Sequence, residues 1–281
     1  MRASPRLSPP MPTAPSDFSQ NLERFTGYAD LYDRFRPAPP ADLVTVLKLF
    51  AGLSAIDLVV DLGSGTGLST RYWASHAARV VGVEPTADMR KVAATQTQAS
   101  NVTYRNGFSH DTGLPDRCAQ IVSCSQALHW MSPQETFLEA RRILQPGGVF
   151  SANDYDWPPT VGSWEAEAAY AACMQTVLRL EKEHRTGAGL QQSDKSGHLA
   201  RMQSSGCFRH VKEAVIHHND EGDAERLVGL LLSQGNVMGL LKHGLTEADL
   251  GIDRLRAIAG RTLGPQRRTW HWSARLRMGI V

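Results

Sequence analysis

The chain has 281 residues, of which 42% are hydrophobic and 21% are charged, and its formal net charge is +2. This length and composition allow a large buried core, which excludes a disordered or fibrous protein and favours a soluble globular one. Lys and Arg form no long run, so the sequence has no electrostatic footprint for nucleic acid or an anionic membrane surface. We therefore expect neither a nucleic-acid nor a membrane partner.

The cysteines and the first residues of the chain limit the metal and targeting alternatives. The four cysteines show neither a CxxC pair nor a zinc-type Cys/His spacing, so we predict buried free thiols and no metal site. No apolar run reaches the roughly 18 residues of a membrane span. The first 17 residues hold five prolines but no apolar h-region. We expect a disordered tail over 1–16 and a cytoplasmic protein.

Structured elements are expected from residue 17 onward. Apolar residues recur at three- and four-residue steps over 25–35, which is typical of an amphipathic helix, and the segment RPAPP ends it. A second helix is predicted over 41–51. The segment DLVVDLG, 57–63, is a short apolar run bounded by glycine, as in a fully buried parallel strand. The glycines that follow therefore lie on a strand-to-helix turn.

Helices and strands then alternate as far as residue 152. The alternation predicts right-handed βαβ crossovers and a parallel sheet with helices on both faces. The predicted helices are 68–76, 86–98 and 132–144, and the predicted strands are 79–84, 102–106, 119–125 and 148–152.

The remainder of the chain is less regular. Residues 160–205 are mainly helical with a polar interruption, and we interpret them as a helical lid insertion that covers the substrate. A late strand over 207–218, two helices within 223–262 and a closing strand over 269–281 follow. The predicted fold class is α/β: one Rossmann-like, doubly wound domain over 17–281 with a mostly parallel, seven-stranded sheet.

Three glycines, Gly63, Gly65 and Gly67, stand at alternate positions in VVDLGSGTGLST. Glycine lets backbone approach a ligand where a Cβ would clash, and the turn leaves N–H groups at the start of a helix. A dinucleotide fold needs its third glycine where Leu68 stands, and the Gly-Lys-Ser/Thr of a P-loop is absent. An NAD-dependent oxidoreductase is therefore the less favoured alternative.

Glu84 ends the second predicted strand, in the segment VVGVEP. An acidic side chain at this place accepts hydrogen bonds from both hydroxyls of a ribose. We therefore predict a nucleoside ligand that lacks a pyrophosphate bridge.

These segments resemble the class I S-adenosylmethionine-dependent methyltransferases, specifically the small-molecule branch called type 11. The likeness covers about 25–152 and rests on VVDLGSGTG, VVGVEP, GFSHDTGLP, SQALHWM and EARRILQPGGVF, in that order. It implies an enzyme that uses S-adenosyl-L-methionine as cofactor and methylates a small-molecule acceptor. The reaction would be an in-line displacement, catalysed mainly by alignment in a dry pocket. Either a monomer or a homodimer is expected.

The resemblance also implies a set of cofactor-binding residues. Many relatives carry an acidic residue where Phe108 stands, so Ser109 or Asp111 is expected to replace its contact with adenine. The implied cofactor-binding residues are Asp61, Gly63, Ser64, Gly65, Glu84, Pro85, Met89, Phe108, Ser109, Ser125 and Gln126.

The acceptor is expected beside SQALHWM, just past the fourth predicted strand, where ligands bind in open α/β folds. His129 is the predicted catalytic residue, because histidine takes up protons near neutral pH; the alternative is a structural histidine fixed by a hydrogen bond. A non-catalytic cofactor-binding or regulatory protein of the same fold is the alternative function. The predicted substrate-binding residues are Tyr32, Trp130, Tyr155 and Trp157.

Overall fold

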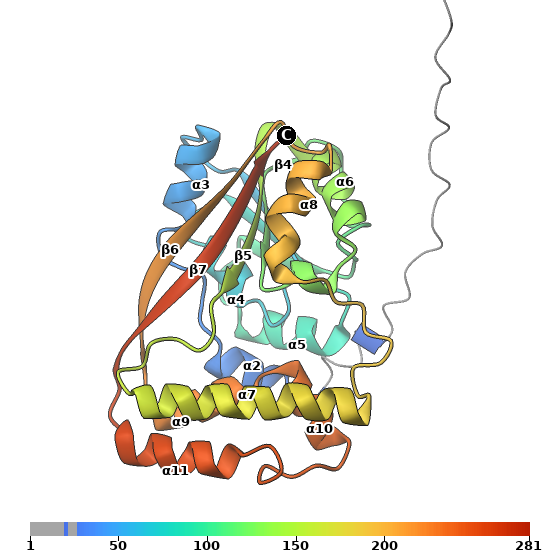
Figure 1. Ribbon diagram of the computed structural model, residues 1–281. Coiled ribbons are helices and arrows are strands. Elements are labelled where there is room, and N and C mark those ends of the chain that lie inside the picture. The colour runs from blue at the N-terminus through green and yellow to red at the C-terminus, as the bar shows by residue number, and fades with distance from the viewer. Residues whose placement is uncertain (1–19, 22–26) are drawn as a thin grey trace, which may run out of the picture.

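One sheet of seven strands runs through the centre of the computed structural model, which describes residues 20–21 and 27–281 (Figure 1). The strand order is β3-β2-β1-β4-β5-β7-β6; the first five strands are parallel, and β7 is antiparallel to both of its neighbours. The predicted α/β fold with a mostly parallel, seven-stranded sheet is confirmed. The strands are β1 (Leu58–Leu62), β2 (Arg79–Val83), β3 (Val102–Arg105), β4 (Ala119–Ser125), β5 (Leu144–Tyr155), β6 (His210–Gly222) and β7 (Arg268–Ile280).

Helices cover both faces of this sheet. Side chains alternate across a strand, so Val59 packs in one core with α3 and α4, while its neighbour Val60 packs in the opposite core with α6 and α8. This two-sided burial explains the continuously apolar run at β1. The helices involved are α3 (Leu43–Ala51), α4 (Leu68–Trp73), α6 (Pro133–Ile143) and α8 (His198–Ser204); α5 (Ala87–Gln96) packs beside β3.

A separate helical layer lies across the carboxyl end of the parallel strands (Figure 1). Its apolar core joins the facing sides of the helices to Trp270 and Trp272 of β7. The layer consists of α2 (Ala29–Phe35), α7 (Trp164–His184), α9 (Ala224–Leu232), α10 (Gly235–Lys242) and α11 (Ile252–Thr262).

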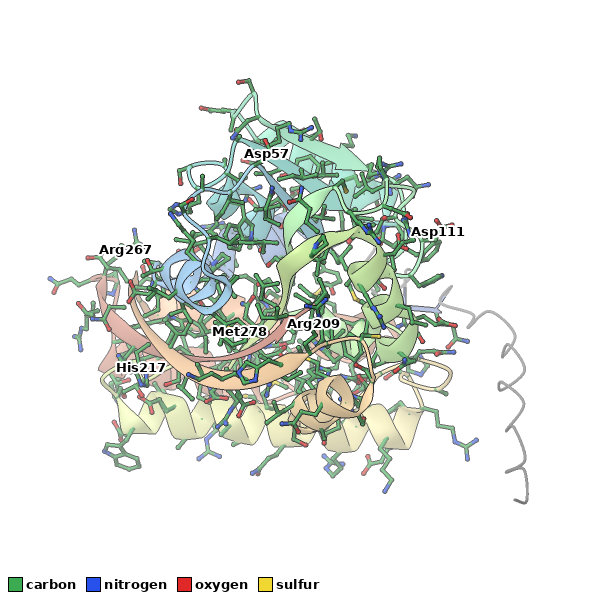
Figure 2. The ribbon with its side chains drawn as sticks, turned by 90° about the horizontal axis from the view of Figure 1, so that it is seen from above. Asp57, Asp111, Arg209, His217, Arg267 and Met278 are labelled. Atoms are coloured by element: carbon green, nitrogen blue, oxygen red, sulfur yellow. The ribbon has the colours of Figure 1, made fainter. Side chains whose placement is uncertain are left out.

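The β6–β7 pair links this layer to the sheet. It is continuous from His210 opposite Ile280 to Gly222 opposite Arg268. Arg209 and Arg267, which precede the two strands, lie at opposite ends of the pair when it is seen from above (Figure 2). The pairing keeps the helices α9 to α11, which are inserted between the two strands, at the carboxyl end.

Three predictions of elements are wrong, because long-range contacts extend or divide the segments. Strand β5 continues past the predicted 148–152, since residues 153–155 pair with β7 and are therefore strand residues. Pairing with β7 also extends β6 to Gly222. Residues 223–262 form three helices instead of two, because the chain turns at Ser233 and Gln234 between α9 and α10.

The predicted lid segment, 160–205, is divided between two places. Its long helix α7 belongs to the helical layer, whereas α8, preceded by the short 3-10 helix η2 (Lys195–Gly197), packs on α6 and β6. The function of this segment as a lid stays a prediction. The predicted tail, 1–16, lies outside the described residues.

The cysteines and the helices bear on two further predictions. All four cysteines are free thiols; Cys118 is half-buried and the other three are buried. Within the part of the chain that the structure describes, no helix combines the length and the apolar character needed to cross a membrane.

Candidate active site

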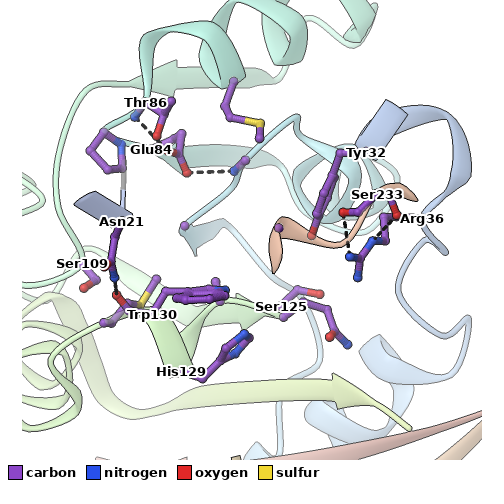
Figure 3. A pocket seen from close by; sticks show the side chains of 18 of the residues that line it. Asn21, Tyr32, Arg36, Glu84, Thr86, Ser109, Ser125, His129, Trp130 and Ser233 are labelled. Atoms are coloured by element: carbon purple, nitrogen blue, oxygen red, sulfur yellow. Dashed lines mark hydrogen bonds between the residues drawn. The ribbon is translucent and has the colours of Figure 1, made fainter. Parts of the chain in front are cut away.

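A pocket opens at the carboxyl end of the parallel strands, between the sheet and the helical layer (Figure 3). Glu84 and Thr86 lie on one side, Tyr32, Arg36 and Ser233 lie opposite, and Ser125, His129 and Trp130 line the side next to β4. Most of the predicted site residues meet here. Those that line the pocket are Tyr32, Gly63, Gly65, Glu84, Pro85, Met89, Phe108, Ser109, Ser125, Gln126, His129, Trp130 and Trp157.

The glycine turn joins β1 to α4 and is fixed by the neighbouring strand. The backbone N–H groups of Gly63 and Ser64 donate to the carbonyl of Val83, at 2.9 and 3.1 Å. Gly63 has φ +64°, and a Cβ there would lie 2.6 Å from the Cε of Met131. Gly65 has φ +54°, but a Cβ there would meet no atom within 4 Å. The turn therefore presents bare backbone at Gly65 to open space.

Glu84 lies directly after β2 and is held by two backbone donors. Its Oε2 accepts from the N–H of Gly65 at 3.1 Å, and its Oε1 accepts from the N–H of Thr86 at 2.8 Å. The side chain is buried, and burial raises the pKa of its carboxyl above the ordinary value. A carboxylate has about four lone-pair sites, so two acceptor positions remain for a ligand.

Asp61 and Ser64 do not line the pocket but lie behind the glycine turn. Asp61 is fully buried and accepts hydrogen bonds from the hydroxyls of Ser69 at 3.2 Å and Thr70 at 2.7 Å. These bonds tie the end of β1 to the first turn of α4. Burial raises the pKa of Asp61 to about 7. The residue supports the turn from within the core.

Phe108 and Ser109 form the wall after β3. Phe108 is partly exposed and stacks on His110, with 5.3 Å between the ring centroids. The hydroxyl of Ser109 shares a hydrogen bond with that of Thr136 at 2.9 Å. Asp111, the expected alternative to an acidic residue at 108, does not line the pocket. The wall on this side is therefore an aromatic face and a hydroxyl that already has a partner.

Gln126 follows β4 with a backbone conformation that is rare for a side chain. Its φ is +54°, its N–H donates to the carbonyl of Asn153 at 2.8 Å, and its Oε1 accepts from the Nζ of Lys195 at 3.4 Å. Its Nε2 is enclosed and has no hydrogen-bond partner in the described residues. A left-handed residue that is not glycine costs about 1–3 kcal/mol, and such residues cluster at ligand sites.

His129 lies in the short 3-10 helix η1 (Leu128–Trp130), next to Trp130. Only 5% of the residue is exposed, and its Nδ1 lies 3.8 Å from Oδ1 of Asp154, beyond hydrogen-bond distance. Burial lowers its pKa well below the ordinary value, and the charge of Lys195 acts in the same direction. The imidazole is therefore neutral at pH 7 and can accept a proton.

Asp154 is the centre of a buried charge cluster behind His129. Lys195 and Arg277 each place a nitrogen 3.1 Å from its carboxylate, and Arg277 also pairs with Glu213 at 2.8 Å. His198 lies on the other side, 4.0 Å away, and burial lowers its pKa to about 4. The carboxylates of Asp154 and Glu213 thus face the cations of Lys195 and Arg277, so the formal charges of these four residues cancel without a ligand.

Tyr155 is the predicted substrate residue that the structure places elsewhere. Its hydroxyl donates to the carbonyl of Ala38 at 2.5 Å, and its ring packs on Trp272 in the core of the helical layer. The residue is buried and does not line the pocket. Because β5 extends through Tyr155, alternation along the strand turns this side chain away from the side occupied by Asp154.

Arg36 lines the pocket and was not found by sequence reasoning, which treated it only as the end of a helix. Its Nε donates to the hydroxyl of Ser233 at 2.8 Å, and its Nη2 donates to the Ser233 carbonyl and to Oε1 of Gln234, both at 2.9 Å. The guanidinium lies 4.9 Å from the ring centre of Tyr32 and 4.7 Å from that of Trp157.

Other pocket residues were missed because they come from distant segments. Asn21, for example, donates to the carbonyls of Trp130 at 3.2 Å and Gln191 at 2.8 Å, across long stretches of sequence. Thr86 was within reach, since it directly follows the segment VVGVEP. The missed residues with polar or charged side chains include Asn21, Arg36, Thr86, His110, Lys195, Ser233 and Gln234.

Comparisons with known proteins agree with this arrangement. Residues 60–152 match the family model described as a methyltransferase domain. An uncharacterized methyltransferase of Mycobacterium bovis is 33% identical over 120 residues, which are 42% of this chain and 46% of that protein. The erythromycin 3''-O-methyltransferase of Saccharopolyspora erythraea is 32% identical over 120 residues, which are 40% and 39% of the two chains. The chain spans about half the length of the curated relatives it matches.

Two solved structures share the fold. One, described as a type II methyltransferase from Anaeromyxobacter dehalogenans, is 23% identical with a TM-score of 0.66, and the likeness covers 88% of this chain and 98% of the other. Phosphoethanolamine N-methyltransferase 2 of Haemonchus contortus is 12% identical with a TM-score of 0.52, and the likeness covers 93% and 58%. The matched segment, its relatives and the fold show that the chain carries a methyltransferase domain with a Rossmann-like α/β fold.

Proposed function

We propose that the chain binds S-adenosylmethionine in this pocket and transfers its methyl group to a small-molecule acceptor. The observation that carries the proposal is the pairing of Glu84 with Gly65. A buried carboxylate with two acceptor positions left lies beside bare backbone that faces open space. These are the features that a ribose and its attached chain require.

The residues that line the pocket are of the kinds that this cofactor requires. Glu84 would accept the two ribose hydroxyls, and Met89 and Phe108 would bound the adenine. Ser125 and Gln126, at the end of β4, would lie beside the methionine part. The unpartnered amide Nε2 of Gln126 supports this placement, because a buried donor without a partner is costly unless a ligand supplies one.

The acceptor side of the pocket is suited to aligning an acceptor with the methyl group of the cofactor. When bound, S-adenosylmethionine would supply an electrophilic methyl carbon, to which an acceptor atom would bond as the opposite carbon–sulfur bond breaks and S-adenosylhomocysteine leaves. Trp130, Trp157 and Tyr32 form aromatic walls that exclude water and orient an apolar acceptor. By its name, one matched relative methylates an oxygen of erythromycin, which supports a small-molecule acceptor.

His129 is the residue placed to handle the acceptor's proton. Its neutral imidazole lines the pocket, and Trp130 packs against its ring with 4.9 Å between the ring centroids. For a hydroxyl acceptor, His129 would take the proton released as the new bond forms. For a carboxylate or thiolate acceptor no base is needed, and His129 would serve as a hydrogen-bond donor.

Calorimetry with S-adenosylhomocysteine tests the proposal. Glu84→Ala should weaken binding about tenfold to a hundredfold, since hydrogen bonds to a charged group are worth about 1.5–3 kcal/mol. Asp88→Ala is the matched control, because Asp88 is an exposed carboxylate in the first turn of α5 outside the pocket. Unchanged affinity in Glu84→Ala would exclude this site.

Turnover separates an enzyme from a non-catalytic binding protein of the same fold. The protein is incubated with cofactor labelled in its methyl group and with extracts of its host, and the labelled product is identified. We expect a labelled small molecule. Tight binding of S-adenosylhomocysteine together with an absence of labelled product across the extracts would favour the regulatory alternative.

A further inference from the structure

Arg36 is a charged residue of the pocket that forms no ion pair with any acidic residue in the described part of the chain. The hydrogen bonds recorded for its guanidinium go to a hydroxyl, a carbonyl and an amide oxygen, all of them uncharged. Lys195, the other strongly basic residue of the pocket, pairs with Asp154 at 3.1 Å. The pocket therefore contains one cation that lacks a counter-ion from the described chain.

The guanidinium is held in a fixed orientation. Three of its five N–H groups are used by Ser233 and Gln234, and Tyr32 and Trp157 pack within 5 Å of it. Its Nη1 makes no hydrogen bond to a described residue. Because the bonded groups come from the turn between α9 and α10, the helical layer itself fixes the guanidinium of this pocket residue.

A half-buried cation of this kind is costly unless a ligand compensates it. Transfer of a charge out of water is unfavourable without a partner, and protein interiors normally pair such charges. Guanidinium groups suit carboxylates in particular, because their N–H groups form short, charge-assisted hydrogen bonds with the carboxylate oxygens. The aromatic rings around Arg36 also limit access to planar or narrow groups.

We propose that Nη1 of Arg36 binds a carboxylate inside the pocket. The inference rests on the proposed function, because that function places a carboxylate here in one of two ways. It is either the α-carboxylate of the cofactor's methionine part or a carboxylate carried by the acceptor. The chemistry at Arg36 is the same in both cases, and the experiment distinguishes the two sources.

The first arm compares S-adenosylhomocysteine with 5'-methylthioadenosine, which keeps the nucleoside and sulfur but lacks the amino-acid part. Calorimetry is done on the full chain and on Arg36→Met. If the carboxylate belongs to the cofactor, Arg36→Met weakens S-adenosylhomocysteine about tenfold to a hundredfold and leaves methylthioadenosine within about twofold. Arg36→Lys should recover part of the loss, because it keeps the charge without the planar group.

Arg34→Met is the matched control. Arg34 lies on the same helix two residues earlier, is mostly exposed and pairs with Glu225 outside the pocket. Arg34→Met should change neither the affinity for S-adenosylhomocysteine nor the affinity for methylthioadenosine. Methylthioadenosine serves as a second control for folding, since a collapsed pocket would lose both nucleosides together.

The second arm tests an acceptor carboxylate. With S-adenosylhomocysteine at saturation, benzoate and benzamide are titrated as a charged and an uncharged probe of the same shape. If the acceptor supplies the carboxylate, S-adenosylhomocysteine binds Arg36→Met normally, while benzoate binds only the unsubstituted chain and benzamide binds both chains equally weakly.

Two results would overturn the inference. In one, Arg36→Met loses both nucleosides equally, which makes Arg36 a structural residue. In the other, neither S-adenosylhomocysteine nor benzoate distinguishes the substituted chain from the unsubstituted one. Failure of the proposed function gives a different result, because the unsubstituted chain would then bind neither S-adenosylhomocysteine nor methylthioadenosine. In that case benzoate, titrated alone, still tests Arg36, and benzoate binding that Arg36→Met abolishes would keep the carboxylate site.

Discussion

The two ends of the pocket are built by different means. The nucleoside end consists of short turns directly after β1, β2 and β3, and its polar contacts come from backbone N–H groups and one carboxylate, Glu84. The opposite end consists of side chains such as Arg36, His129 and Lys195, which reach the pocket from three segments far apart in the chain. The first end depends on where parallel strands stop, whereas the second depends on how the helical layer packs.

The difference indicates where specificity is encoded. A site made from strand ends follows from the sheet topology and can be shared by all proteins with this fold. A site made from inserted helices can change whenever the insertions change. We therefore assign the nucleoside part of the cofactor to the first end and acceptor choice to the second, and four substitutions test this division.

Replacement of Gly65 by leucine should have the largest effect on cofactor binding. The open space at its Cβ position is the space we assign to the cofactor, so Gly65→Leu should weaken S-adenosylhomocysteine more than about a hundredfold, equivalent to about 2.8 kcal/mol. The control is Gly52→Leu, because Gly52 also has a positive φ, also faces open space, and ends α3 away from the pocket. Calorimetry and thermal unfolding separate the two effects. If Gly65→Leu and the unsubstituted chain bound S-adenosylhomocysteine equally well, the bare backbone at Gly65 would not be part of the binding site.

The second substitution removes a buried charge that lies behind the opposite end of the pocket. The side chain of Arg277 is 3% exposed and pairs with both Asp154 and Glu213, so Arg277→Met leaves two carboxylates short of a cation. We expect about 3–5 kcal/mol of destabilisation in urea unfolding. Lys195→Met should cost less than about 1 kcal/mol, because Lys195 is partly exposed and Asp154 keeps Arg277. Similar losses in the two variants would contradict this ranking.

His129→Gln should lower kcat/KM about a hundredfold if His129 is the base, with S-adenosylhomocysteine affinity unchanged. Because burial lowers the pKa of His129 well below 6.5, the neutral form persists through neutral pH, and the rate should fall only in more acidic solution. If His129 is a donor instead, KM rises and kcat changes little.

His198→Gln is the matched control for His129. His198 is also buried beside Asp154 but does not line the pocket, so its replacement should leave kcat/KM within about twofold. A His129→Gln protein that loses cofactor affinity and thermal stability together with activity would identify His129 as a structural residue.

The sequence predicts the nucleoside end better than the opposite end for a physical reason. The apolar run before Gly63, the glycines themselves and Glu84 lie within consecutive strand and turn segments, so local periodicity places them at one edge of the sheet. Asp61 is the exception there. It lies in the same motif, yet its side chain points into the core toward Ser69 and Thr70, and sequence spacing does not show that direction.

The opposite end depends on contacts that no local pattern records. Arg36 is positioned by Ser233 and Gln234, which lie almost two hundred residues later in a turn that the sequence did not separate from its helices. Tyr155 lies beyond the predicted strand 148–152, and only its pairing with β7 shows that it is a strand residue. The general fold follows from alternation and periodicity, whereas these side chains follow from tertiary packing.

Cofactor binding is expected to change least at Asp61, where the main effect concerns the pH dependence of stability. In the folded chain its pKa is about 7, against an ordinary value of 3.8, so the native state holds a proton that the unfolded chain releases. The associated stability is fully present below about pH 4 and is lost as the pH rises through about 7, with a slope of at most about 1.4 kcal/mol per pH unit. Asp61→Asn should remove this slope, because an amide can bond both hydroxyls without titrating.

Urea unfolding between pH 4 and 8 measures this slope in both proteins. The control is Asp57→Asn, which removes an exposed carboxylate paired with Arg79 just before the same strand. Asp61→Asn should also bind S-adenosylhomocysteine within a few-fold of the unsubstituted chain, since Asp61 lies behind the turn and not in the pocket. An unchanged pH slope would mean that Asp61 stays ionised in the folded chain. A large loss of S-adenosylhomocysteine affinity in Asp61→Asn would instead mean that Asp61 contacts the cofactor directly. The nucleoside end would then bind the cofactor through two carboxylates, Glu84 and Asp61.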